Sequence, residues 1–149
     1  VSLDDGLFPE GQTLNILVRV LQLGENDKET LVWTSRSYGD RLAVAGKDEL
    51  TFRWEDRPFQ VDWRPGDRFV VEVWNYKTLR SRKVFEYDAD SDDEFPLRTG
   101  KHVVARLADG KLAPKPDANC IAFQSKRLPD SQARPAGDDR VAGRARTIR

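Results

Sequence analysis

Five carboxylates fall within seven consecutive residues, and they form the densest group of side chains that could do chemistry. Such a group could bind calcium, which prefers hard oxygen ligands. Aspartate at every second position opens a calcium-binding loop, but the glycine and distal glutamate of that loop are missing here. We therefore predict a solvated acidic loop, with docking of a basic partner or a metal as the alternatives. The residues are Asp88, Asp90, Asp92, Asp93 and Glu94.

A basic segment lies just upstream of the acidic one. Its four cations are Lys77, Arg80, Arg82 and Lys83. On an exposed turn, such a cluster could bind the phosphates of lipids or an acidic protein surface. The alternative is an exposed loop without a partner.

Tryptophan side chains are a second kind of candidate contact. Trp54 is in phase with Phe52, so we expect it in the core. Trp63 and Trp74 are expected at sheet ends or on an outward face, where a tryptophan often contacts a partner. A sugar-stacking face is the less supported alternative.

Catalytic and metal-binding patterns are missing from the chain. His102 is the only histidine and Cys120 the only cysteine, so no zinc site can be built from such residues and no disulfide can form within the chain. No nucleophile motif and no phosphate-binding glycine loop occur. We predict a protein that is not an enzyme, with no catalytic residue, no cofactor and no bound metal.

Apolar residues at every second position predict the elements that carry these side chains. Runs with this period are typical of strands that are buried on one face. The turn at 64–67 contains Pro65 and Gly66, which suit a tight connection between two such runs. We predict an all-β, antiparallel Greek-key β-sandwich of about eight strands over residues 13–125. The expected strands are 13–23, 30–36, 41–45, 59–63, 68–75, 84–87, 101–107 and 120–124, with a further alternating pair at Phe52 and Trp54.

The two ends of the chain differ from this body. Residues 1–12 form a polar arm, and residues 126–149 form an extended basic tail with seven Lys or Arg against three Asp. The tail is too poor in apolar residues to fold alone, so we expect it to contact an acidic surface of the body or of a neighbouring subunit. Its candidate contact residues are Arg134, Arg140, Arg144 and Arg146.

The charge and hydropathy of the whole chain narrow the classes of partner. Lys+Arg and Asp+Glu are both 25, so the chain lacks the strong positive field of a nucleic-acid-binding protein. No apolar run approaches the ~20 residues of a transmembrane segment. The sequence does not specify the cellular compartment. If Val1 follows a removed targeting peptide, we expect an organelle or an extracytoplasmic compartment.

Several segments resemble the C2-type β-sandwich, the family of calcium- and phospholipid-binding modules. The resemblance covers about residues 13–107, through the strand 14–20, the pair of strands around 59–75 and the segment 75–85 that follows them. It implies the sandwich fold. In this family, aspartates after the sixth strand bind calcium, and here Asn75 and Lys77 occupy the matching positions. The resemblance therefore does not imply calcium binding.

These observations lead to two hypotheses on function. The first is a non-enzymatic structural or interaction subunit of a larger protein assembly, with other protein subunits as partners. The alternative is a calcium-independent peripheral membrane module that binds anionic lipid through the turn at 77–83.

Overall fold

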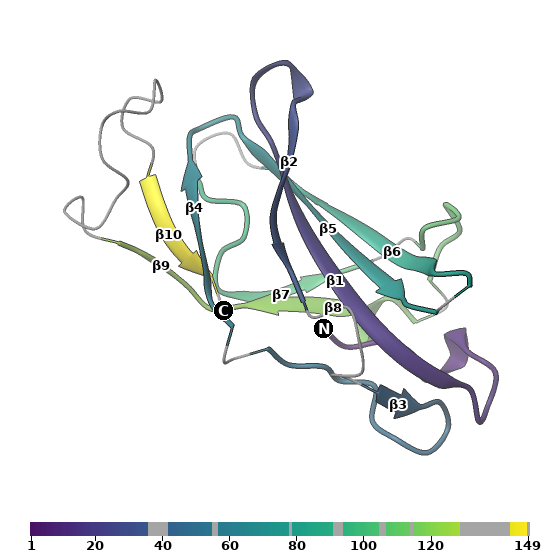
Figure 1. Ribbon diagram of the computed structural model, residues 1–149. Coiled ribbons are helices and arrows are strands. Elements are labelled where there is room, and N and C mark those ends of the chain that lie inside the picture. Colours follow the sequence, from purple (N-terminus) through teal and green to yellow (C-terminus); the bar gives the residue numbers. More distant parts are fainter. Residues whose placement is uncertain are drawn as a thin grey trace.

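The computed structural model describes residues 1–35, 42–54, 57–77, 79–90, 94–104, 107–113, 115–128 and 144–148, and it confirms an all-β fold with antiparallel sheets (Figure 1). The main sheet has the strand order β2-β1-β5-β6, and β3 also pairs with β1. Its strands are β1 (Thr13–Leu23), β2 (Glu29–Thr34), β3 (Leu42–Val44), β5 (Arg68–Asn75) and β6 (Arg82–Ala89).

A second layer packs on this sheet. The strands β7 (Gly100–Val103) and β8 (Cys120–Phe123) pair with each other and run across β1 and β5 (Figure 1). A separate sheet has the order β4-β10-β9, with β4 (Phe59–Trp63), β9 (Ser125–Arg127) and β10 (Arg144–Ile148). The short 3-10 turns are η1 (Asp5–Leu7), η2 (Glu25–Asp27) and η3 (Pro116–Ala118).

The core consists of the apolar residues that recur at every second position of the central strands, as predicted. In β1 and β5 every second residue is buried against the second layer, which contributes Val61, Ile121 and Phe123. The segment 95–97 re-enters the core, where Phe95 and Leu97 are buried. The inward residues of the two central strands are Leu14, Ile16, Val18, Val20, Phe69, Val71 and Val73.

Three details of the strand prediction are wrong. Residues 50–54 form an isolated bridge at Thr51 instead of a strand. At β7 the predicted phase is reversed, because Val104 is buried while Val103 is 47% exposed. The strand β6 also extends to Ala89, so Asp88 belongs to a strand and not to a loop. The alternation of β6 in fact continues to Ala89, which is buried and pairs with Phe69 of β5, so its acidic residues hid the end of the strand.

Both ends of the chain pair with the body. Ser2 bridges Thr51 and Cys120, and Leu3 is buried in the core. In the tail, β10 pairs antiparallel with β4 and also with β9. The tail therefore contacts the chain's own body, one of the two surfaces expected for it. Ten strands occur within the described residues, and the two beyond the predicted eight come from the tail.

Candidate functional site

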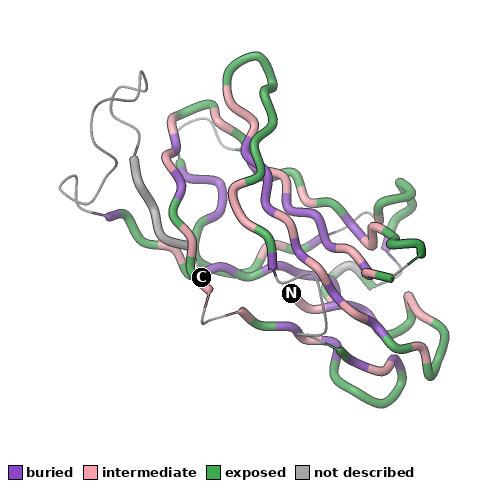
Figure 2. The backbone as a smooth tube through the Cα atoms, viewed as in Figure 1, coloured by how far each residue is buried: buried purple, intermediate pink, exposed green. Residues whose placement is uncertain are grey.

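The basic turn connects β5 to β6, and Lys77 and residues 79–82 are exposed. Its ends are held by Ser81, whose Oγ accepts a hydrogen bond from the Lys77 amide (3.2 Å) and donates one to the Lys77 carbonyl (3.3 Å). Lys77, Arg80 and Arg82 are exposed, and Leu79 is 96% exposed. In Figure 2 the described residues of this turn carry the colour of exposed residues. The turn therefore presents a large apolar side chain among cations, which the sequence analysis did not single out.

Lys83 was predicted on the exposed turn but lies in β6 and is half-buried; its role as a contact residue stays a prediction. Its Nζ lies 2.8 Å from a carboxylate oxygen of Glu72 and 2.8 Å from one of Glu86. The hydrogen bonds with these two carboxylates raise the pKa of Lys83. Glu72 is almost fully buried and also pairs with Arg19 at 3.5 Å. This ion-pair network joins β1, β5 and β6, so it holds the sheet together.

The two tryptophans predicted as contacts have different environments. The prediction for Trp63 is wrong: its side chain is fully buried, its Nε1 donates to the Asp67 carbonyl (3.1 Å), and its ring packs edge-on against Phe95. Trp74 is half-buried on the outward face of β5, with the Lys83 ammonium 5.3 Å from its ring centroid. Whether Trp74 contacts a partner stays a prediction.

His102 and Cys120 are the remaining candidate residues, and they lie in different environments. The backbone carbonyl of Arg98 can only accept, so His102 Nε2 donates to it (3.0 Å), and His102 Nδ1 is hydrogen-bonded to the Tyr87 hydroxyl (3.1 Å). Burial raises the pKa of Tyr87. Cys120 is buried. Within the described ranges, no group of three His, Cys, Asp or Glu side chains could hold a metal ion.

The acidic segment and the tail are described in part. Asp88, Asp90 and Glu94 are exposed, and Glu94 pairs with Arg98 at 2.9 Å. Asp92 and Asp93 lie outside the described residues, as do the tail residues Arg134 and Arg140. Arg144 and Arg146 belong to β10, where they pair in register with Trp63 and Val61 of β4.

A cavity of about 420 Å³ opens between the main sheet and β8, and sequence reasoning missed it. Its floor is apolar and consists of side chains from β1, β5 and β8: Val18, Val20, Val71, Ile121 and Phe123. The alternation of these strands predicted buried residues, but it could not indicate that the two layers leave a space between them.

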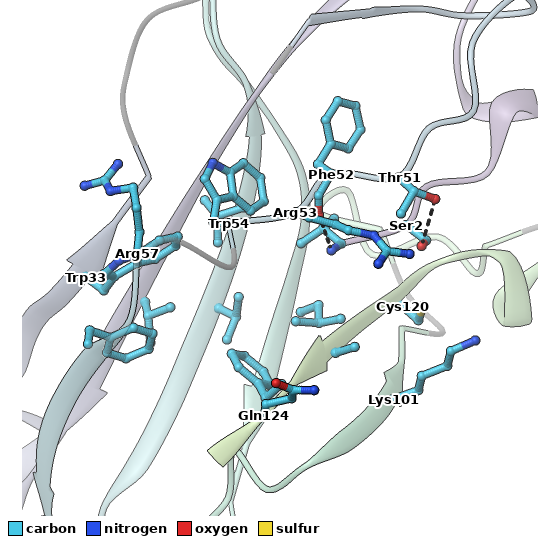
Figure 3. Close-up of a pocket in the computed structure, with 18 of the residues that line it drawn as sticks. Ser2, Trp33, Thr51, Phe52, Arg53, Trp54, Arg57, Lys101, Cys120 and Gln124 are labelled. Atoms are coloured by element: carbon cyan, nitrogen blue, oxygen red, sulfur yellow. Dashed lines mark hydrogen bonds between the residues drawn. The ribbon is translucent and has the colours of Figure 1, made fainter. Parts of the chain in front are cut away.

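The two ends of the cavity differ in chemistry. Figure 3 shows Trp33, Trp54 and Arg57 at one end, and Ser2, Thr51 and Arg53 at the other. At the aromatic end, Trp33 stacks on Phe59 with ring centroids 5.4 Å apart, and Trp54 meets Trp33 edge-on at 6.2 Å. Trp54 was expected in the core and is only half-buried, because it lies at this rim.

Arg57 is held at the aromatic end by its own backbone and by Trp33. Its amide donates to the Trp54 carbonyl (3.2 Å), and its guanidinium carbon lies 5.8 Å from the Trp33 ring centroid. Its Nη1 is buried and has no hydrogen-bond partner within the part of the chain that the structure describes. A buried donor without a partner is costly, so this atom is suited to an anion that enters the cavity.

Comparisons with protein-family models, curated proteins and solved structures find no match to this chain. The resemblance to C2-type domains therefore stays a prediction. No helix in the described residues is long and apolar enough to cross a membrane.

Proposed function

We propose that this chain is a non-catalytic β-sandwich module that docks on an anionic lipid surface without calcium, through the turn between β5 and β6. The observation that carries the proposal is Leu79, which is 96% exposed between Lys77 and Arg80. An exposed apolar side chain flanked by cations is suited to a membrane interface, where the apolar group enters the lipid and the cations meet the headgroups.

The charge of the turn is available for this contact. Lys77, Arg80 and Arg82 are exposed and make no ion pair within the described residues, whereas Lys83 is neutralised by Glu72 and Glu86. Within the described part of the chain, the turn therefore presents three cations that have no carboxylate partner.

A second turn enlarges the same surface. The amide of Ala108 donates to the Val84 carbonyl of β6 (3.2 Å), which anchors the turn at 107–111 beside the basic one (Figure 1). The residues after this bond add Leu112, which is 66% exposed, and the exposed Lys111. Two leucines and four cations therefore lie at one end of the sandwich.

The opposite end of β6 carries the opposite charge. At about 3.3 Å per residue, β6 separates Arg82 from Ala89 by roughly 23 Å. The exposed Asp88 and Asp90 lie at that far end, and Glu94, which follows them in the chain, is paired with Arg98. An anionic surface therefore attracts the end that holds Leu79 and repels the other, which favours one orientation of the module.

The expected affinity is modest. Each cation near an anionic surface contributes about 1 kcal/mol, and burial of a leucine side chain contributes about 1.5–3 kcal/mol. Together the three cations and Leu79 supply roughly 5 kcal/mol, which corresponds to a Kd of a few hundred micromolar. Binding should therefore be reversible and should weaken with salt.

Cosedimentation with vesicles tests the proposal. The full chain should sediment with phosphatidylserine-containing vesicles in EDTA and should stay in solution with pure phosphatidylcholine. We expect Leu79→Ser to weaken binding about tenfold, and replacement of Lys77, Arg80 and Arg82 by Gln to abolish it. Leu31→Ser is the matched control, because Leu31 is an exposed leucine of β2. Failure of the wild type to sediment with the anionic vesicles would refute the proposal.

The first hypothesis, a structural subunit of a protein assembly, has less support. It depended on a tail held by a neighbouring chain, and β10 pairs instead with β4 of the same chain. No feature of the described residues favours it over lipid docking, so it stays a prediction.

A further inference from the structure

We propose that the cavity between the main sheet and β8 binds an amphipathic monoanion, namely a carboxylate attached to an aliphatic chain, as in a fatty acid. This ligand site is distinct from the basic turn. Its volume of about 420 Å³ lies within the usual range of small-molecule sites.

The floor of the cavity suits an aliphatic chain. It consists of branched aliphatic side chains and Phe123, contributed by both layers of the sandwich. A chain that lies on this floor exchanges water for apolar contact along its length, which is the main favourable term for such a ligand. The floor itself offers no polar side chain for a hydrophilic ligand.

The rim favours a negative charge. Among the described residues that line the cavity, Arg53, Arg57 and Lys101 are cations, and Glu49 supplies the one carboxylate. Arg53 and Lys101 are exposed, so their contribution is screened by water, whereas the Nη1 of Arg57 is buried. A carboxylate that accepts a hydrogen bond from this atom would satisfy the buried donor. Arg57 is therefore the expected headgroup anchor.

The aromatic end argues against a sugar as the ligand. A sugar ring stacks on an open aromatic face, but the Trp33 ring is already stacked on Phe59 and also lies beneath the Arg57 guanidinium. These contacts fix the indole as a wall of the cavity. Because Trp33 and Trp54 both lie at this end, their fluorescence should report an occupied site.

Titration of the full chain with decanoate, followed by calorimetry and tryptophan fluorescence, tests the proposal. We expect saturable binding of one decanoate with a Kd below about 1 mM, and at least tenfold weaker binding of decanol, which has the same chain without the charge. The comparison of the two ligands needs no variant. No saturable binding of decanoate, or equal binding of decanol, would overturn the proposal.

Variants locate the site. Arg57→Gln should weaken decanoate binding about 10- to 100-fold, while its melting temperature confirms that the chain still folds. Arg80→Gln, on the basic turn, is the matched control and should leave decanoate binding unchanged. If Arg57→Gln binds like the wild type, Arg57 is not the anchor and the proposal fails. Leu79→Ser should bind decanoate normally, so failure of lipid docking and failure of this site can be distinguished.

Discussion

Replacement of Trp63 by alanine should be among the most destabilising single changes in this chain. Its side chain has no solvent exposure, and its ring packs edge-on against Phe95 with centroids 5.8 Å apart. Removal of such a buried aromatic ring costs about 3–5 kcal/mol, because the lost contacts leave a cavity. That loss is a large part of the roughly 5–15 kcal/mol by which a typical domain is stable.

A second variant separates the hydrogen bond from the packing. Trp63→Phe keeps a ring beside Phe95 but removes the Nε1 donor that binds the Asp67 carbonyl at 3.1 Å. This bond is partly buried, and loss of a typical hydrogen bond costs about 0.5–1.5 kcal/mol. We therefore expect Trp63→Phe to be destabilised by less than Trp63→Ala.

Urea denaturation followed by the fluorescence of the remaining tryptophans measures both variants. Trp74→Ala is the control, since Trp74 is also a tryptophan of a central strand but is half-buried on the outward face; we expect a loss of about 1–2 kcal/mol. A loss below about 1 kcal/mol for Trp63→Ala would refute the burial of Trp63 and would restore it as a candidate contact residue.

Further predictions concern the tail, Lys83, calcium and Trp54. Deletion of residues 144–149 removes β10 from β4. We expect the free energy of unfolding to fall by about 1–3 kcal/mol, so that the chain unfolds at a lower urea concentration. An unchanged urea midpoint would contradict the pairing. The ion pairs of Lys83 raise its pKa in the folded state. Their contribution to stability is therefore fully present below the pKa of the unfolded chain, about 10.4, and is lost as the pH rises through the pKa of the folded state. As the pH rises above about 10.5, the free energy of unfolding should therefore fall less for Lys83→Met than for the wild type, as measured by urea titrations. Parallel pH profiles of the two proteins would refute this. Calcium at sub-millimolar concentration should leave the melting temperature unchanged, because Asn75 accepts a backbone hydrogen bond and Lys77 is a cation; a clear upward shift would contradict this. Trp54→Ala should cost about 1–3 kcal/mol in urea titrations, less than Trp63→Ala, and an equal loss would place Trp54 in the core.

Several features of the fold follow from local sequence. The strands β1, β4 and β5 begin and end at the predicted residues, because unbroken alternation and the turn at 64–67 define them locally. The inward faces of β1 and β5 are also correct. The alternation of apolar and polar residues distinguishes the two faces of a strand. In a two-layer fold, the apolar face must be the buried one.

The candidate sites were less predictable, since they depend on residues that are distant in sequence. The basic turn was found from its charge, but the ion pairs of Lys83 depend on the register that places Glu72 of β5 beside β6. The exposure of Leu79 could have been suspected from its place within a basic loop. Nothing in the local sequence indicated the cavity, because its lining comes from the N-terminus, from β1, β2, β4, β5, β7 and β8, and from residues within 49–54 together with Arg57.

The amino-acid sequence by itself determined the class of fold, the central strands and the separation of basic and acidic segments along the chain. Only the tertiary structure decided what covers each face. It placed Trp63 in the core and Trp54 at the rim of a cavity, and it joined β10 to β4. The physical reason is that periodicity depends on neighbours in sequence, whereas burial, ion pairing and empty volume depend on how the separate sheets pack against each other.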